Sequence, residues 1–186
     1  MNRDTSTALG RSLDQAGCSY TNLFHKGVWI TNRHKIDMTV DYLRRDGSDF
    51  VIGADATDVL IVSEISDLIE KFEAMKCDII FNAEVRFWPR RHMEVYRRHE
   101  EGLAGVGPFK YLNAGLWMGR RKQSLEFFSI CQKLRDWSLH PFSEQACVKR
   151  THAEWGGKSI IDENCVLFQN LNSVPRAWLE LIRSEA

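Results

Sequence analysis

Short apolar segments of strand length alternate with amphipathic segments of helical period along most of this 186-residue sequence. The helical period predicts helices over residues 5–16, 35–45, 64–75, 122–137 and 143–150. The apolar runs predict strands over residues 19–24, 49–54, 78–83, 159–161 and 166–168, with a strand–turn–strand unit over 111–119. This alternation is typical of a layered α/β fold with a mostly parallel sheet flanked by helices, and the length suits a single domain over residues 1–186. Ligands of such sheets bind at the carboxyl ends of the strands.

The composition narrows the class of protein. Lysines and arginines number 25, as do aspartates and glutamates, so the formal net charge is zero. There is accordingly no clear signal for nucleic acid or for an anionic membrane surface. No apolar run approaches the roughly 20 residues of a membrane helix, and residues 1–7 lack the apolar core of a signal peptide. We therefore expect a cytoplasmic protein. The five cysteines form no C-x-x-C pair and indicate neither a zinc site nor a disulfide framework.

Two aspartates three residues apart, Asp55 and Asp58, follow the predicted strand 49–54. They repel each other unless a positive charge lies between them, and the segment 49–62 contains no basic residue. A divalent cation is one solution, because Mg²⁺ and Mn²⁺ favour carboxylate oxygens and take further ligands from a substrate phosphate. The alternative is a turn in which the aspartates accept hydrogen bonds from nearby backbone amides. The first interpretation predicts an enzyme with a nucleotide-linked substrate.

Several segments, in order and over roughly residues 8–172, resemble the glycosyltransferase domain of procollagen lysyl hydroxylases and its viral and bacterial relatives. The matching residues are Trp29, Lys35, Gly53-Ala54-Asp55-Ala56-Thr57-Asp58-Val59-Leu60, Phe81-Asn82-Ala83-Glu84, Trp88-Pro89, Tyr111-Leu112-Asn113-Ala114-Gly115-Leu116-Trp117-Met118-Gly119, Ser143-Glu144-Gln145 and the segment 162–171. The resemblance implies a GT-A-like, Rossmann-type fold and a transferase that moves a hexose from a UDP-sugar to a hydroxyl acceptor.

On the phosphate side, the resemblance assigns Asp55 and Asp58 to the acidic pair that holds Mn²⁺, or Mg²⁺, on the diphosphate of the UDP-sugar. A metal there would neutralise the diphosphate and stabilise charge on the leaving group. Lys35 matches a lysine that approaches the nucleotide phosphates. Its alternative is a solvated residue at the start of a helix, although a cation is unfavourable at that end of the helix dipole.

On the sugar side, the resemblance places Asn113 and Gly115 in a turn beside the donor sugar, where glycine allows close backbone approach. A plain hairpin turn is the alternative for these two residues. Glu84 follows the strand after the acidic turn and is expected in the donor site, or else paired with a nearby arginine. Glu144 and Gln145 match an acidic segment near sugar and acceptor. Glu144 is the candidate base or sugar-positioning carboxylate. Its alternative is an acid in the first turn of a helix, stabilised by the helix dipole.

The chain departs from the family pattern in two places. No apolar strand precedes residue 5, and no histidine follows residue 152, whereas the family opens with such a strand and closes with a metal-binding histidine. His25, His34 or His152 could substitute, but the sequence selects none of them. A missing first strand would leave a sheet edge open for homo- or hetero-oligomers. We therefore keep a catalytically degenerate binding module as the alternative function, and a metal-dependent phosphatase or nucleotidyltransferase as a third.

The segment 84–110 is rich in arginine and glutamate and ends in glycines and a proline. It is too long for an ordinary connection, which predicts a functional or mobile loop. Its arginines could meet phosphates or shape the acceptor side, or they could form a solvated face with the neighbouring glutamates. The sequence leaves the acceptor open between a hydroxylysine-like group, a glycan and a modified nucleobase.

Overall fold

The computed structural model describes residues 7–134 and 140–172. The elements in chain order are α1 (Ala8–Gln15), α2 (His34–Arg45), β1 (Phe50–Ala54), α3 (Ile65–Ala74), β2 (Ile79–Glu84), α4 (Glu94–Leu103), β3 (Tyr111–Arg120), α5 (Arg121–Lys133), α6 (Glu144–Glu154) and β4 (Ser159–Ile161). Within these ranges no helix is both long enough and apolar enough to cross a membrane.

The four strands form one sheet in the order β1-β3-β2-β4. Strand β3 runs antiparallel to both of its neighbours, β1 and β2, whereas β4 runs parallel to β2. The α/β class with an open sheet and flanking helices is confirmed, but the expectation of a mostly parallel sheet is wrong: two of the three pairings are antiparallel. The reason is that β3 inserts between two strands that point the same way.

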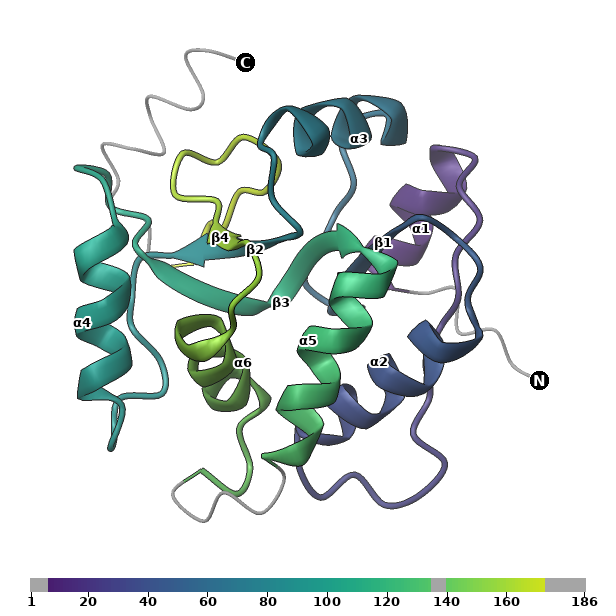
Figure 1. The fold of residues 1–186 in the computed structure, drawn as a ribbon. Coiled ribbons are helices and arrows are strands. Elements are labelled where there is room, and N and C mark those ends of the chain that lie inside the picture. The colour runs from purple at the N-terminus through teal and green to yellow at the C-terminus, as the bar shows by residue number, and fades with distance from the viewer. Residues whose placement is uncertain (1–6, 135–139, 173–186) are drawn as a thin grey trace.

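Helices cover both faces of this sheet. Figure 1 shows α3 on one side of the sheet and α2, α5 and α6 on the other. Successive residues of β2 alternate between the two layers, as the pleat of a strand requires. Ile79 and Phe81 pack against α2, α5 and α6, whereas Ile80 packs with Leu68 and Phe72 of α3. All six residues of β2 are buried, which marks it as a central strand of the fold.

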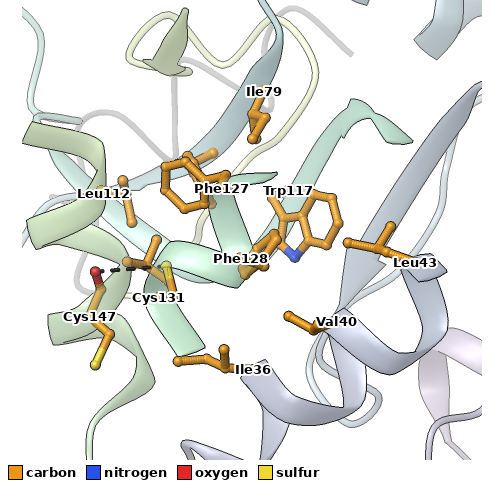
Figure 2. Close-up of a cluster of buried hydrophobic side chains, with 12 residues drawn as sticks. Ile36, Val40, Leu43, Ile79, Leu112, Trp117, Phe127, Phe128, Cys131 and Cys147 are labelled. Atoms are coloured by element: carbon orange, nitrogen blue, oxygen red, sulfur yellow. Dashed lines mark hydrogen bonds between the residues drawn. The ribbon is translucent and has the colours of Figure 1, made fainter. Parts of the chain in front are cut away.

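The larger apolar cluster joins α2 and α5 to the sheet. Ile36, Val40 and Leu43 lie on one face of α2 because their spacings of four and three residues return to the same side of a helix. They approach Trp117 of β3 and Phe128 of α5, whose ring centroids are 4.7 Å apart. Figure 2 shows Leu43 and Phe128 on either side of the indole of Trp117, with Val40 below it. The cluster holds α2 against the sheet and so fixes where α2 begins.

Most predicted elements form, with differences that have local causes. The helices predicted over 35–45, 64–75 and 143–150 and the strands predicted over 49–54, 78–83 and 159–161 are confirmed within one to four residues at each end. The predicted strand 19–24 is wrong: the segment is irregular and its side chains are largely exposed, so it lacks the burial that stabilises a strand. The first two residues of helix 5–16 and the end of helix 122–137 lie outside the described residues.

The predicted strand 166–168 is also wrong, and a buried carboxylate explains the difference. Asp162 is 1% exposed, and its two oxygens accept hydrogen bonds from the backbone N–H groups of Val166, Leu167 and Phe168, each at 2.8 Å. These three donors are therefore directed at one side chain instead of at a neighbouring strand. The result is a tight turn that places Phe168 in the cluster with α3.

The arginine-rich segment 84–110 is more ordered than the sequence indicates. It contains α4, which is anchored by Met93 and Glu100, whose side chains are almost fully buried. The connection to β2 is thus the short loop 85–93. This loop is also anchored, because the Phe87 side chain is 6% exposed and its ring lies edge-on to that of Tyr111 at 5.3 Å.

We expect His152 to make the fold sensitive to acid. Its side chain is buried, and burial, together with the nearby His99 and Lys149, lowers its pKa to about 4. His152 binds a proton near pH 6.5 in the unfolded chain but only near pH 4 in the folded chain. Its contribution to the free energy of unfolding is therefore complete above pH 6.5 and is lost as the pH drops toward 4. The loss reaches about 3 kcal/mol, at 1.36 kcal/mol per pKa unit. Urea unfolding at several pH values measures it.

The control for this expectation is a pair of substitutions. His152→Asn removes the titrating ring while keeping a polar group near the Ser159 hydroxyl, which lies 2.8 Å from Nδ1. It should flatten the pH dependence, whereas His92→Asn on the exposed loop should leave it unchanged. If the free energy of unfolding varied with pH equally in the wild type and in His152→Asn, the acid sensitivity would not come from His152.

Candidate active site

Two helix starts and one strand end meet at a pair of ionic contacts. Asp55 directly follows β1, Lys35 lies in the first turn of α2, and Glu144 is the first residue of α6. The Nζ of Lys35 donates to Oδ1 of Asp55 at 2.7 Å and to Oε1 of Glu144 at 3.1 Å. The Ser143 hydroxyl caps α6 by accepting from the backbone N–H of Ala146 and fixes where this helix starts.

The environment keeps Lys35 charged. Burial alone would lower its pKa, but the hydrogen bond to Asp55 and the charges of Glu144 and Asp55 more than offset that effect, so the pKa is raised. The Lys35 side chain is still 33% exposed, so solvent screens these ion pairs and they add little to stability. Lys35 is therefore a protonated group that a ligand can reach.

Strand β3 carries a bulge at the site, where the sequence predicted a turn between two strands. Trp117 pairs with Phe81 of β2, but the next residue of β2, Asn82, pairs with Asn113. Residues 114–116 are thus left without partners in β2, which bends the strand locally. The prediction of a strand–turn–strand unit is wrong because β3 continues through the irregularity as one strand.

The bulge brings Gly115 against Asp55. The carbonyl of Gly115 accepts from the backbone N–H of Asp55 at 2.7 Å, and its own N–H donates to Oδ1 of Asn113 at 2.9 Å. A Cβ atom at position 115 would lie 2.9 Å from Oδ2 of Asp55 and 3.1 Å from Oδ1 of Asn113. Only glycine leaves room for this close approach.

Glu84 and Gln145 connect β2 to α6 on the other side of the bulge. The Nε2 of Gln145 donates to Oε1 of Glu84 at 2.6 Å and to the carbonyl of Trp88 at 2.9 Å. Its Oε1 accepts from the backbone N–H of Ala114 at 3.3 Å. The Nδ2 of Asn113 contacts Oε2 of Glu84 at a longer 3.5 Å. Both amide side chains are thus held in fixed orientations by the Glu84 carboxylate.

These contacts form a closed circuit, which we call the polar ring. Its members are Lys35, Asp55, Gly115, Asn113, Glu84, Gln145 and Glu144. Glu144 and Gln145 are neighbours in the chain and close the circuit. The sequence predicted these seven residues from segments far apart in the chain, and the fold brings all of them together. Their assigned roles remain predictions.

Asp58, the eighth predicted residue, is not a member of the polar ring. It is exposed and makes no hydrogen bond or ion pair with the other described residues. Within 7–134 and 140–172, no three His, Cys, Asp or Glu side chains gather where they could hold a metal ion. None of the candidate histidines fills that role: the rings of His25 and His34 stack at 3.8 Å, and His152 is buried against Ser159.

A buried ion pair lies near Glu84, and sequence reasoning missed it. Lys149 of α6 and Glu100 of α4 are each 1% exposed, with the Nζ of Lys149 2.8 Å from Oε2 of Glu100. The same Nζ lies 4.6 Å from the ring centre of Phe87. Burial raises the pKa of Glu84, and the charge of Lys149 offsets this only in part. Nothing in the local sequence marks Lys149 as buried.

A cavity of about 550 Å³ opens beside the polar ring. Its walls include Glu84, Asn113 and Gln145 of the ring, and Arg86 and Arg90 of the loop that follows β2. Sequence reasoning noted these arginines only as members of a long charged segment.

A family model described as the PLOD GT domain matches residues 33–184, which is most of the chain and includes every predicted site residue. No curated protein matches the sequence.

Proposed function

The chain belongs to the PLOD GT domain family, a family of glycosyltransferase (GT) domains, and we propose that it is a metal-dependent glycosyltransferase that moves a hexose from a UDP-sugar to a hydroxyl acceptor. The observation that carries the proposal is the polar ring at the carboxyl ends of β1 and β2. Such strand ends are where open α/β sheets bind their ligands. The ring offers groups for the diphosphate and for the sugar of a nucleotide-sugar.

Lys35 is the proposed partner of the diphosphate. It is protonated, partly exposed and held between two carboxylates, so an incoming phosphate can replace Asp55 as its partner without moving the lysine far. A lysine ammonium binds phosphate as a point charge. Its pair with Glu144 can persist while the donor is bound, which would keep that carboxylate in place.

Asp55 and Asp58 are the residues that would hold a Mn²⁺ or Mg²⁺ ion. Two carboxylates at an exposed turn suit these hard cations, which accept the rest of their ligands from phosphate and water. Such an ion would supply charge neutralisation at the diphosphate leaving group.

Glu144, Gln145, Asn113 and Glu84 are the proposed sugar and acceptor groups. In the transfer, the acceptor hydroxyl oxygen forms a bond to the anomeric carbon while the bond from that carbon to the diphosphate breaks. The hydroxyl proton must go to a base, and Glu144 is the candidate for it. Gln145 and Asn113 hold the Glu84 carboxylate in a fixed position, where it can accept hydrogen bonds from sugar hydroxyls.

Calorimetric titration of UDP with and without Mn²⁺ tests the proposal. We expect binding that requires Mn²⁺ and that weakens about ten-fold or more in Asp58→Asn, because one of two carboxylate ligands loses its charge. Asp58 has no contact to lose in the described structure, so its folding stability should not change. Asp49→Asn, an exposed aspartate at the opposite end of β1, is the matched control and should bind UDP normally.

Other outcomes separate the parts of the proposal. If UDP binds equally well without Mn²⁺ and in Asp58→Asn, the proposed metal site would be contradicted. The proposed nucleotide site would stand. Absence of UDP binding in the folded wild type would contradict nucleotide-sugar transfer. That result would favour the second candidate, a binding module. Among the described residues, β1 pairs with β3 alone, so its other edge is open to a partner chain.

A further inference from the structure

The loop 85–93 separates two cavities that share walls. The cavity of about 550 Å³ beside the polar ring and a second one of about 460 Å³ are both lined by Arg86, Phe87 and Arg90. The second cavity is also lined by Glu94 and Arg97 of α4 and by Tyr111 of β3. A ligand that reaches the polar ring from this side therefore passes the two shared arginines.

These two arginines are not paired with other described residues of the protein. Arg86 and Arg90 are exposed, and neither makes a hydrogen bond or ion pair with the other described residues. Arg97, in contrast, contacts Glu101 at 3.3 Å. Glu84 and Glu94 are acidic residues that line the cavities. Glu84 is buried and already accepts two hydrogen bonds, whereas Glu94 is exposed. The wall that the two cavities share thus presents two guanidinium groups to solvent.

The loop that carries the arginines is held firmly at both sides. Phe87 is buried between the Lys149 ammonium and Tyr111, and the carbonyl of Trp88 accepts from Gln145. Arg86 and Arg90 flank these anchored residues, so their backbones are fixed relative to the polar ring. Guanidinium groups on an anchored backbone lose less freedom on binding, and their planar donors match carboxylate and phosphate.

We infer that Arg86 and Arg90 bind an anionic group of the acceptor, a carboxylate or a phosphate, on the side of the transferred sugar away from Asp55. That the bound anion is part of an acceptor rests on the proposed function. The anion site itself does not depend on that function. Neither Lys35 nor Asp55 lines the shared cavities, which separates this site from the diphosphate. A cationic acceptor would be repelled here.

The test compares charged and neutral probes. Methyl glucuronide, glucose 6-phosphate and neutral methyl glucoside are titrated into the protein without UDP, with binding followed by NMR shifts and calorimetry. We expect at least one anionic probe to bind about ten-fold or more tightly than the neutral one, since hydrogen bonds to charged groups are stronger than those between neutral groups. Preference between the two anions identifies the carboxylate or the phosphate.

Arg86→Gln/Arg90→Gln should abolish that preference while leaving UDP affinity and the thermal midpoint unchanged. Arg44→Gln/Arg45→Gln on α2 changes the net charge equally and should keep the preference. Equal affinity for all probes in the wild type overturns the anion site, whether or not UDP binds. Loss of UDP affinity in the Arg86/Arg90 variant also overturns it, by assigning these arginines to the donor phosphates. UDP binding without anion preference leaves the proposed function intact.

Discussion

Replacing Lys149 with methionine is expected to lower the free energy of unfolding by about 3–5 kcal/mol, because it leaves the Glu100 carboxylate buried without its partner. Lys149 and Glu100 are each 1% exposed, and both carboxylate oxygens lie within 3.0 Å of the Nζ. Burial already raises the pKa of Glu100 to about 7 despite the lysine. Chemical denaturation of the wild type and the variant measures the loss.

The dependence of this loss on pH is part of the expectation. Without the lysine charge the pKa of Glu100 rises further, so at about pH 5 the buried carboxyl is protonated and the loss is smaller than at about pH 8. The double variant Lys149→Met/Glu100→Leu removes both charges and should recover much of the stability.

A neighbouring surface pair provides the control for Lys149→Met. Arg150 follows Lys149 on α6 and contacts Glu154 at 3.2 Å, but these side chains are 31% and 54% exposed, in contrast to the buried pair. Arg150→Gln should therefore change stability by no more than about 0.5 kcal/mol. A loss below about 1 kcal/mol in Lys149→Met at both pH values would mean that Glu100 needs no partner, contrary to its burial.

Lys149 also shows where reasoning from the sequence ends. A helix over 143–150 is recognisable, but the four consecutive residues 146–149 of α6 are all buried. A helix buried on several sides has no single apolar face, so its period does not reveal which polar residue is inside. The partner, Glu100, lies in a segment whose charges predicted a solvated surface. The contact between these residues depends on how α4 packs against α6, which neither segment encodes alone.

The polar ring was more accessible to sequence reasoning, because its residues lie in segments that resemble a known family. The acidic pair that includes Asp55 stands out after an apolar run, whereas the resemblance assigned Glu84 at the end of β2 and Glu144 at the start of α6 to the site. The bulge was not predicted. Gly115 reads equally well as a turn residue, and only the pairing of β3 with both neighbours keeps the strand continuous through it. Strand order and direction are properties of the assembled sheet, which explains why antiparallel pairing of β3 was missed.

Gly115→Ala is expected to lower the rate of sugar transfer about 100-fold, the effect of misplacing a reacting group by about an ångström. The new methyl group would lie 2.9 Å from Oδ2 of Asp55. Because the backbone of Asp55 is tied to Gly115 by a 2.7 Å hydrogen bond, the carboxylate must rotate away. That rotation breaks its contact with Lys35 and moves the proposed metal ligand. Manganese-dependent UDP affinity and transfer rate, measured on the same preparation, report the change.

The matched substitution is Gly47→Ala, because a Cβ at that position meets nothing within 4 Å. It should leave both UDP affinity and transfer rate at wild-type values. Crowding at Gly115 also strains the bulge, at about 1–3 kcal/mol, so the variant is compared well below its thermal midpoint. If Gly115→Ala bound UDP and turned over like Gly47→Ala while remaining folded, the close approach of the bulge to Asp55 would be irrelevant to function. If only Gly115→Ala lost manganese-dependent binding, the carboxylate position set by the bulge would be what the donor site requires.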